Sequence, residues 1–279
     1  MPFASLSKAR IEYFEHGSGP EVIVFVHGFQ ASARIWHFVQ EALPADRYRS
    51  VAINNRGAGL SDAPADEGAF SVQEFAADAY ELTRHLGLPR FTLVGHSLGG
   101  ATVAQFAVDH PEMLNGLVLL DPSDPDGRDV AADEVERIID DRIAARREQI
   151  ARGGGGDGID ARSAGAGDGV RALLLADINA APEQRLRGSM RSMFSLRIGH
   201  RVRDLPVPVL LCGGDADALI PIEQMLRTWA KYPAGTGLHI WHGVGHSPNL
   251  DIPDKVAGVI RRFIEEAVPA RQAVVPAAP

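Results

Sequence analysis

The chain has almost no cysteine and no excess of positive charge. Cys212 is the single cysteine among 279 residues, which excludes an intramolecular disulfide, and its apolar surroundings favour a buried, unreactive thiol. The formal net charge is −8, and the arginines are scattered rather than gathered in a stripe. Because binding to phosphate backbones or anionic membranes requires concentrated basic side chains, this composition argues against nucleic acid and anionic membranes as partners.

Long apolar runs and metal-binding patterns are also absent from the sequence. No run approaches the length of a membrane-spanning helix, and no apolar segment of a secretory signal follows the charges in residues 1–10. Histidines do not occur at the paired spacings of a zinc site, and no glycine-rich loop precedes a nucleotide-binding lysine. We therefore expect a cytoplasmic protein with no membrane insertion, no metal and no cofactor. The sequence does not specify an oligomeric state.

The strongest positive signal is a Gly-x-Ser-x-Gly motif at residues 95–99. An apolar run at 91–94 leads into the motif, and a helical pattern follows it directly. A serine on such a sharp strand-to-helix turn has an exposed hydroxyl, and the two glycines let strand and helix approach closely. Ser97 is therefore the predicted nucleophile.

A serine hydroxyl needs a histidine to accept its proton and a carboxylate to orient that histidine. His246 is the predicted base because it lies in a glycine-containing loop between an apolar run and a helical pattern. Two other histidines compete, but His239 falls inside the apolar run and His242 precedes the loop glycines. Asp217 is the preferred acid, ahead of Asp215, and both follow the apolar run 207–212.

The order of elements predicts an α/β fold. Strand-like runs alternate with helical periodicity over 22–120 and again over 207–264, which is typical of a mostly parallel, doubly wound sheet covered by helices. Between these parts, apolar residues at helical spacing predict helices at 129–152, 170–179 and 182–197. Glycine-rich stretches at 153–156 and 165–169 interrupt this pattern and are interpreted either as hinges or as a surface loop.

We divide the chain accordingly into two core segments, an insertion and a tail. The core comprises residues 1–121 and 204–268, and residues 122–203 form a helical insertion between them. Residues 269–279 lack a stable pattern and are expected to form a flexible tail. The serine, acid, histidine order along the chain accompanies one particular sheet architecture.

At this level of detail the sequence resembles the α/β-hydrolase family over most of its length. Residues 22–29 resemble the family strand that ends in His-Gly-x, and residues 54–62 resemble its Asp-x-Arg-Gly-x-Gly-x-Ser segment, with Asn54 replacing the usual aspartate. The resemblance implies an eight-stranded type of sheet and a helical cap that chooses the substrate. It also implies that the backbone N–H groups of Phe29 and Leu98 form an oxyanion hole.

The resemblance also bears on which aspartate is the acid that orients His246. Asp217 follows Gly214 and precedes Pro221 at the spacings of the family acid, whereas Asp215 does not. Some relatives draw their acid from the preceding strand, which makes Asp121, at the end of the run 117–120, the alternative acid.

The predicted function is a serine hydrolase. It would cleave a small-molecule carboxylic ester, lactone or thioester through an acyl-enzyme on Ser97. Related proteins use the same residues to cleave C–C bonds of diketones or to make peracids, and both reactions remain alternatives. An alternative of another class is a non-catalytic protein that binds a small ligand on the same fold. The serine argues against dehalogenation and epoxide hydrolysis, which use an aspartate in this fold.

Overall fold

A computed structural model describes residues 2–152 and 168–268 of the chain. The glycine stretch 153–156, most of the stretch 165–169 and the tail 269–279 lie outside the described residues. Within the described part the helices are α1 (His37–Glu41), α2 (Val72–His85), α3 (Leu98–Asp109), α4 (Ala132–Ala151), α5 (Asp168–Ala180), α6 (Glu183–Ser195), α7 (Gly199–Val202), α8 (Ile222–Trp229), α9 (Pro248–Asp251) and α10 (Pro253–Glu266). Short 3₁₀ helices are η1 (Ala33–Trp36), η2 (Glu67–Phe70) and η3 (Pro111–Met113).

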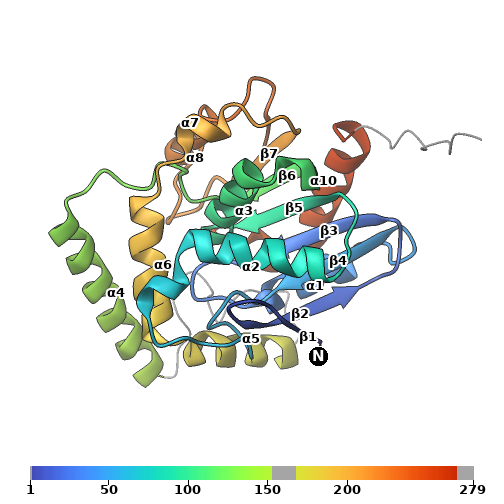
Figure 1. The fold of residues 1–279 in the computed structure, drawn as a ribbon. Coiled ribbons are helices and arrows are strands. Elements are labelled where there is room, and N and C mark those ends of the chain that lie inside the picture. Colours follow the sequence, from blue (N-terminus) through green and yellow to red (C-terminus); the bar gives the residue numbers. More distant parts are fainter. Residues whose placement is uncertain (1, 153–167, 269–279) are drawn as a thin grey trace, which may run out of the picture.

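A single sheet organises the described residues (Figure 1). Its strands are β1 (Phe3–Ser5), β2 (Arg10–His16), β3 (Glu21–Val26), β4 (Tyr48–Ile53), β5 (Phe91–His96), β6 (Leu114–Leu120), β7 (Val209–Gly214) and β8 (Gly237–Trp241). The spatial order is β1-β2-β4-β3-β5-β6-β7-β8, and the strands from β4 to β8 pair in parallel, whereas β1 and β2 pair antiparallel. The predicted eight-stranded, mostly parallel sheet is therefore confirmed.

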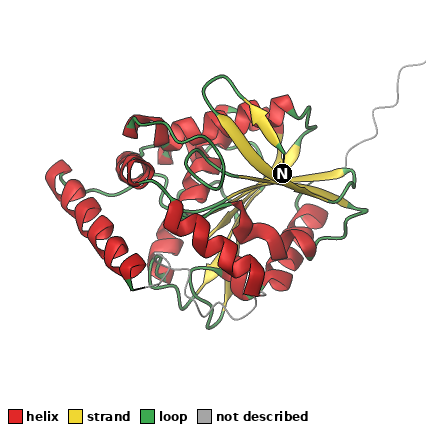
Figure 2. Cartoon of the chain, turned by 90° about the horizontal axis from the view of Figure 1, so that it is seen from below, coloured by secondary structure: helices red, strands yellow, loops and turns green. Residues whose placement is uncertain are grey.

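Both faces of the sheet are covered, as Figure 2 shows for the strands running between helices. In β3, Val22, Val24 and Val26 join the apolar cluster that contains α2 and α3. The alternate residues Ile23 and Phe25 join a second cluster that contains α1 and α10. Because successive strand side chains point to opposite faces, a strand buried on both sides has to be apolar throughout, as β3 is.

The insertion between β6 and β7 carries α4, α5, α6 and α7. The first three correspond to the helices predicted at 129–152, 170–179 and 182–197. α4 and α6 lie side by side at the left of Figure 1, and their apolar faces form a separate cluster that includes Ile139, Ile143, Leu186 and Met190. The insertion thus has a small core of its own.

A buried arginine connects this insertion to the sheet. Arg185, on α6, is 1% exposed and donates hydrogen bonds to the carbonyl oxygens of Ala31, at 2.9 Å, and Gly57, at 3.3 Å. Burial lowers the pKa of Arg185 to about 9, with the charge of Arg146 acting in the same direction. Both acceptors belong to loops of the core, so α6 is held against the sheet by polar contacts that water does not reach.

None of the helices in residues 2–152 and 168–268 is both long enough and apolar enough to cross a membrane.

A buried ion pair stabilises the loop after β4. Arg56 and Asp78 have side chains that are each 3% exposed, and the guanidinium meets both carboxylate oxygens, at 2.5 and 2.7 Å. We expect Asp78→Ala to lower the free energy of unfolding by about 1.5–3 kcal/mol, because it removes two charge-assisted hydrogen bonds from a buried guanidinium that keeps Glu74 as an ion-pair partner at 2.8 Å. Glu265→Ala, which breaks the exposed pair with Arg47, is the control and should cost less than about 1 kcal/mol. Urea denaturation measures both, and equal losses would contradict the prediction.

Candidate active site

Ser97 lies on a tight turn between β5 and α3, at the carboxyl end of a central strand. Its backbone has φ +55° and ψ −118°, a left-handed conformation that is strained for a residue with a Cβ atom. The Ser97 N–H donates to the carbonyl oxygen of Leu120 at 3.0 Å, and its own carbonyl accepts from Gly100 and Ser123 at 2.8 and 3.1 Å. These hydrogen bonds hold the turn in a conformation that the residue would not otherwise favour.

Two glycines make the turn possible. A Cβ atom on Gly95 would lie 2.3 Å from the carbonyl oxygen of Gly99, and one on Gly99 would lie 2.4 Å from the carbonyl oxygen of Val26. These distances are far shorter than van der Waals contact, and the obstructing atoms are backbone atoms. The first turn of α3 therefore packs directly on β5 and β3 only because both positions lack a side chain.

His246 and Asp217 form a close pair. His246 follows β8 and Asp217 follows β7, and because these strands are parallel neighbours, their carboxyl ends meet at one edge of the sheet. The Nδ1 atom of His246 lies 2.6 Å from Oδ2 of Asp217. The other carboxylate oxygen, Oδ1, accepts N–H bonds from Leu219 and Ile220 at 2.7 and 3.0 Å.

These contacts keep the Asp217 carboxyl ionised. Burial alone would raise the pKa of this carboxyl, but the hydrogen bond and charge of His246 and the two backbone N–H groups hold its pKa below the usual range. The Asp217 side chain is completely buried, and that of His246 is 11% exposed. A buried carboxylate in this position can orient the ring and stabilise an imidazolium.

A second aspartate–histidine pair lies nearby but points elsewhere. Asp215 bonds to Nδ1 of His242 at 2.8 Å, and the His242 side chain is 98% exposed. Neither residue lines the cavity that contains Ser97. His239 lies within β8, where it packs edge-on against Trp241. Of the three histidines considered from sequence, His246 is the one that lines this cavity.

Asp121, the alternative acid, lies next to Asp217. It is fully buried with φ +42°, and its Oδ1 accepts the N–H of Gly214 at 3.1 Å. Its Oδ2 has no hydrogen-bond donor among the described residues, and its carboxyl contacts that of Asp217. Burial, followed by the charge of Asp217, raises the pKa of Asp121 well above its usual value. A protonated Asp121 can donate to the Asp217 carboxylate, which makes two adjacent buried carboxyls compatible.

Phe29 and Leu98, whose N–H groups are the predicted oxyanion donors, lie in the loop after β3 and at the start of α3. Leu98 is the first residue of α3, a position whose N–H has no partner within its own helix, and Phe29 lines the cavity together with Ser97. Among the described residues, neither of these N–H groups makes a hydrogen bond. After Phe29, Gln30 has φ +57°, and the buried His27 accepts the N–H of Asn55 through Nε2 at 3.1 Å. The loop is thus held in an unusual conformation.

The structure explains why Asn54 replaces the aspartate of the family pattern. Its Nδ2 donates to Oε2 of the buried Glu12 at 2.7 Å, and its Oδ1 accepts the N–H of Ala33 at 2.6 Å. An aspartate at this position would place two carboxylates in contact without a donor between them. The amide therefore suits a chain that carries glutamate at position 12.

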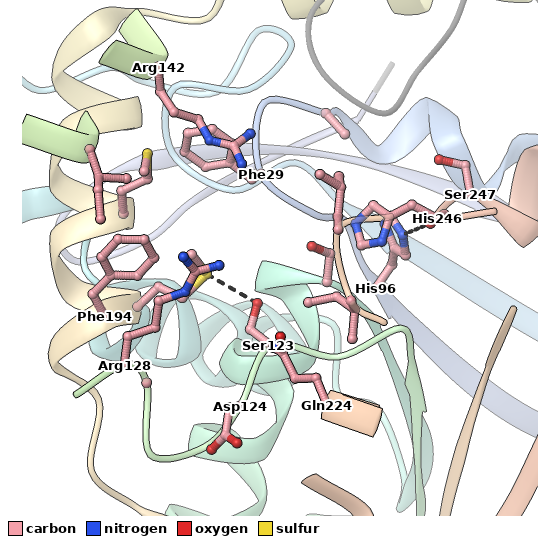
Figure 3. A pocket seen from close by; sticks show the side chains of 18 residues that line it. Phe29, His96, Ser123, Asp124, Arg128, Arg142, Phe194, Gln224, His246 and Ser247 are labelled. Carbon is pink, nitrogen blue, oxygen red and sulfur yellow. Dashed lines mark hydrogen bonds between the residues drawn. The ribbon is translucent and has the colours of Figure 1, made fainter. Parts of the chain in front are cut away.

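His96 is a residue whose role sequence reasoning missed. It is 5% exposed, and its Nε2 lies 2.7 Å from the carbonyl oxygen of His246, while the two rings are 4.9 Å apart (Figure 3). Burial, and secondarily the nearby His246, lowers the pKa of His96 to about 3, so the ring is neutral and Nε2–H is the donor. The residue beside Ser97 therefore anchors the loop that carries His246. In the sequence, only the position of His96 next to Ser97 pointed to this anchoring role.

The cavity lies between the sheet edge and the insertion (Figure 3). Ser97, His96 and His246 contribute one part of its wall. The insertion contributes another part, comprising Ser123, Asp124, Gly127, Arg128, Ile138, Arg142, Met190, Met193 and Phe194. The methionine and phenylalanine side chains of α6 thus both pack against α4 and line the cavity. In residues 2–152 and 168–268 no group of three or more metal-ligating acidic, histidine or cysteine side chains is gathered.

The sheet order, the turn at Ser97 and the matching family pattern define the class of protein. Residues 21–155 match the family described as alpha/beta hydrolase fold. The chain has the α/β-hydrolase fold and is a hydrolase.

Individual relatives span several activities. The chain is 28% identical to a fluoroacetate dehalogenase of a Burkholderia species over 280 residues, covering 90% of this chain and 89% of the relative. It is also 28% identical to a non-heme haloperoxidase of Rhodococcus erythropolis over 279 residues, covering 95% and 100%. Among solved structures, an esterase from Exiguobacterium antarcticum superimposes with a TM-score of 0.80 at 21% identity, covering 94% and 98% of the two chains.

Because the turn at Ser97 is closely packed, one methyl group added at Gly95 should strongly lower the stability of the protein. We expect Gly95→Ala to lower the free energy of unfolding by about 2 kcal/mol or more, because its Cβ would overlap the Gly99 carbonyl and Val103. Gly258→Ala, in the interior of α10 with no atom near the added Cβ, should instead stabilise the protein by about 0.5–1 kcal/mol. Urea unfolding compares the two. A Gly95→Ala protein as stable as the parent would refute the packing argument.

Proposed function

We propose that the protein is a serine hydrolase that cleaves a carboxylic ester, lactone or thioester of a small molecule. The observation that carries this proposal is that Ser97, on its strained turn, shares a cavity with His246, whose Nδ1 is bound to the ionised Asp217. Nucleophile, base and orienting acid are thus the three groups that acyl transfer requires. Ser97, Asp217 and His246 follow the strands β5, β7 and β8. The carboxyl ends of these parallel strands lie at the same edge of the sheet.

In the proposed mechanism His246 removes the proton from the Ser97 hydroxyl through Nε2, because Nδ1 is engaged by Asp217. The serine oxygen attacks the carbonyl carbon, and the N–H groups of Phe29 and Leu98 stabilise the negative charge on the carbonyl oxygen. Each such donor is typically worth about 3 kcal/mol of barrier. His246 then protonates the leaving group, activates a water molecule and so releases the acid from Ser97.

The nucleophile narrows the choice among the reactions of the relatives. Dehalogenases and epoxide hydrolases of this fold use an aspartate that forms an ester intermediate, and position 97 is a serine. The fold is similar to that of the solved esterase, and this similarity supports an ester as the substrate. In this proposal the insertion, residues 122–203, acts as a cap, since its residues line the cavity opposite the histidines. The non-catalytic alternative accounts less well for an ionised Asp217 that holds a histidine in the same cavity as the serine turn.

Covalent labelling tests the nucleophile. A fluorophosphonate probe should add to Ser97, as read by peptide mass spectrometry, and 4-nitrophenyl acetate should be hydrolysed. Ser97→Ala should abolish labelling and lower kcat/KM by about 10⁴-fold or more while the protein remains folded. Ser123→Ala, which removes another hydroxyl of the same cavity, is the control and should still be labelled. A folded protein with intact Ser97 that takes up no probe and hydrolyses no ester would refute the proposal.

The two buried carboxyls are expected to differ in role. Asp217→Asn should reduce kcat by about 10³-fold or more, because it removes the charge that stabilises the imidazolium and disturbs its tautomer. Asp121→Asn should retain kcat within about threefold, because an amide can donate to Asp217 as the protonated acid does. Steady-state kinetics on a 4-nitrophenyl ester compare them. The reverse ranking would identify Asp121 as the acid.

The effect of Asp121→Asn on the free energy of unfolding should depend on pH. Because the pKa of Asp121 is raised in the fold, the native state holds a proton that the unfolded chain releases above its ordinary pKa of about 3.9. The native state then binds more protons, so this group costs increasing stability as the pH rises. Asp121→Asn removes that cost and should be more stable than the parent at pH 8, with the difference shrinking towards pH 4. Urea midpoints at both pH values check this, and an unchanged difference would argue against a protonated Asp121.

A further inference from the structure

Two arginines from the insertion line the cavity that contains Ser97. Arg142 lies on α4, and Arg128 lies in the segment that leads into that helix. Figure 3 shows both side chains reaching into the cavity from the insertion, across from His96 and His246. Permanent positive charge is therefore concentrated on the wall opposite the proposed catalytic groups.

Arg128 has surroundings unlike those of the other arginines in the insertion. Its guanidinium carbon lies 4.7 Å from the centre of the Phe194 ring, and it forms no ion pair with a carboxylate of the described residues. Several neighbouring arginines are instead paired with acids of the insertion, in the pairs Arg147–Glu183, Arg187–Asp140 and Arg191–Glu136. Stacking on an aromatic ring fixes the guanidinium plane and leaves its N–H edge available to an acceptor.

Two acids at or beside the cavity, Asp124 and Asp217, already have partners. Asp124 accepts a hydrogen bond from Lys231 at 2.6 Å, and Asp217 is bound to His246. Burial, and then the charge of Arg142, lowers the pKa of Arg128, which indicates that two like charges are close in a partly desolvated place. An anion beside Arg128 would offset this electrostatic cost and form charge-assisted hydrogen bonds with its guanidinium.

The remaining wall of the insertion is apolar. Ile138, Met190, Met193 and Phe194 lie between the arginines and the residues of the core. A matching ligand has a hydrophobic body, one charged end and a reactive carbonyl. A carboxylate suits the charged end best, because the planar fork of arginine matches its two oxygens.

We propose that the substrate is an ester or lactone that also carries a free carboxylate, which Arg128 and Arg142 bind while the scissile carbonyl faces Ser97. This inference rests on the proposed serine hydrolase activity and adds the class of substrate. The arginines are specificity-determining residues of the insertion, and the apolar side chains of α6 set the distance between the charged end and the carbonyl.

A matched pair of substrates tests the proposal. 4-Nitrophenyl hydrogen adipate carries a carboxylate, and in its methyl ester an uncharged group that is larger by one methyl replaces that carboxylate. We expect kcat/KM to be at least about tenfold higher for the anionic ester, equivalent to about 1.4 kcal/mol. Arg128→Met and Arg142→Met should each reduce the ratio of the two kcat/KM values about tenfold. Added NaCl should lower the ratio for the parent protein, because salt screens the interaction.

A matched control and a binding measurement complete the test. Arg137→Met removes an exposed arginine of α4 that does not line the cavity, and it should leave the ratio unchanged. Calorimetric titration of Ser97→Ala with both esters measures the charge preference without turnover. Equal kcat/KM and equal affinity for the two esters would overturn the inference and leave the hydrolase intact. Tighter binding of the anionic ester without any turnover by the parent would support the arginine site and overturn the proposed hydrolysis. Phosphate that competes as well as adipate would overturn the choice of a carboxylate.

Discussion

The structure depends on how closely α3 approaches β5 and β3. Gly95 and Gly99 bring backbone to backbone at distances that a single methyl group would prevent, and Ser97 between them has a left-handed conformation. This strain is balanced by hydrogen bonds to Leu120 and Ser123 at the end of the adjacent strand β6. The same packing leaves the N–H of Leu98 unpaired at the start of a helix, so one steric constraint supports both the proposed nucleophile and a proposed oxyanion donor.

Around this turn, burial distinguishes groups that are chemically alike. Asp215 and Asp217 each bind a histidine, but the Asp215 pair is exposed to water, whereas the Asp217 pair is buried beside the cavity. Asp121 and Asp217 are adjacent carboxyls, yet one is surrounded by three donors and is ionised, while the other has a raised pKa. Water screens the exposed Asp215 pair strongly and has much less access to the Asp217 pair, so the Asp217 charge acts on the cavity with less screening.

The arginines of the insertion include two groups that differ in their surroundings. Arg185 and Arg146 are buried and donate to backbone carbonyls, which fastens helices to loops. Arg128 and Arg142 instead face the cavity. The rigid attachment of α6 through Arg185 reaches the loop that contains Phe29, since its acceptor is the carbonyl of Ala31. The insertion is therefore coupled to the proposed oxyanion loop as well as to the substrate-facing wall.

Local rules were sufficient to predict much of this protein from its sequence. The alternation of strand and helix patterns predicted the sheet, and the glycine spacing around Ser97 predicted its turn, because both signals arise from neighbouring residues. Other features depend on contacts between residues far apart in the chain. Examples are the neutral His96 that anchors the His246 loop, the contact between Asp121 and Asp217, and the arginines that face the cavity. The sequence determined the residue types and their order along the chain, whereas only the tertiary structure decided which charges are buried and which side chains share a cavity, because desolvation and proximity are properties of the packed chain.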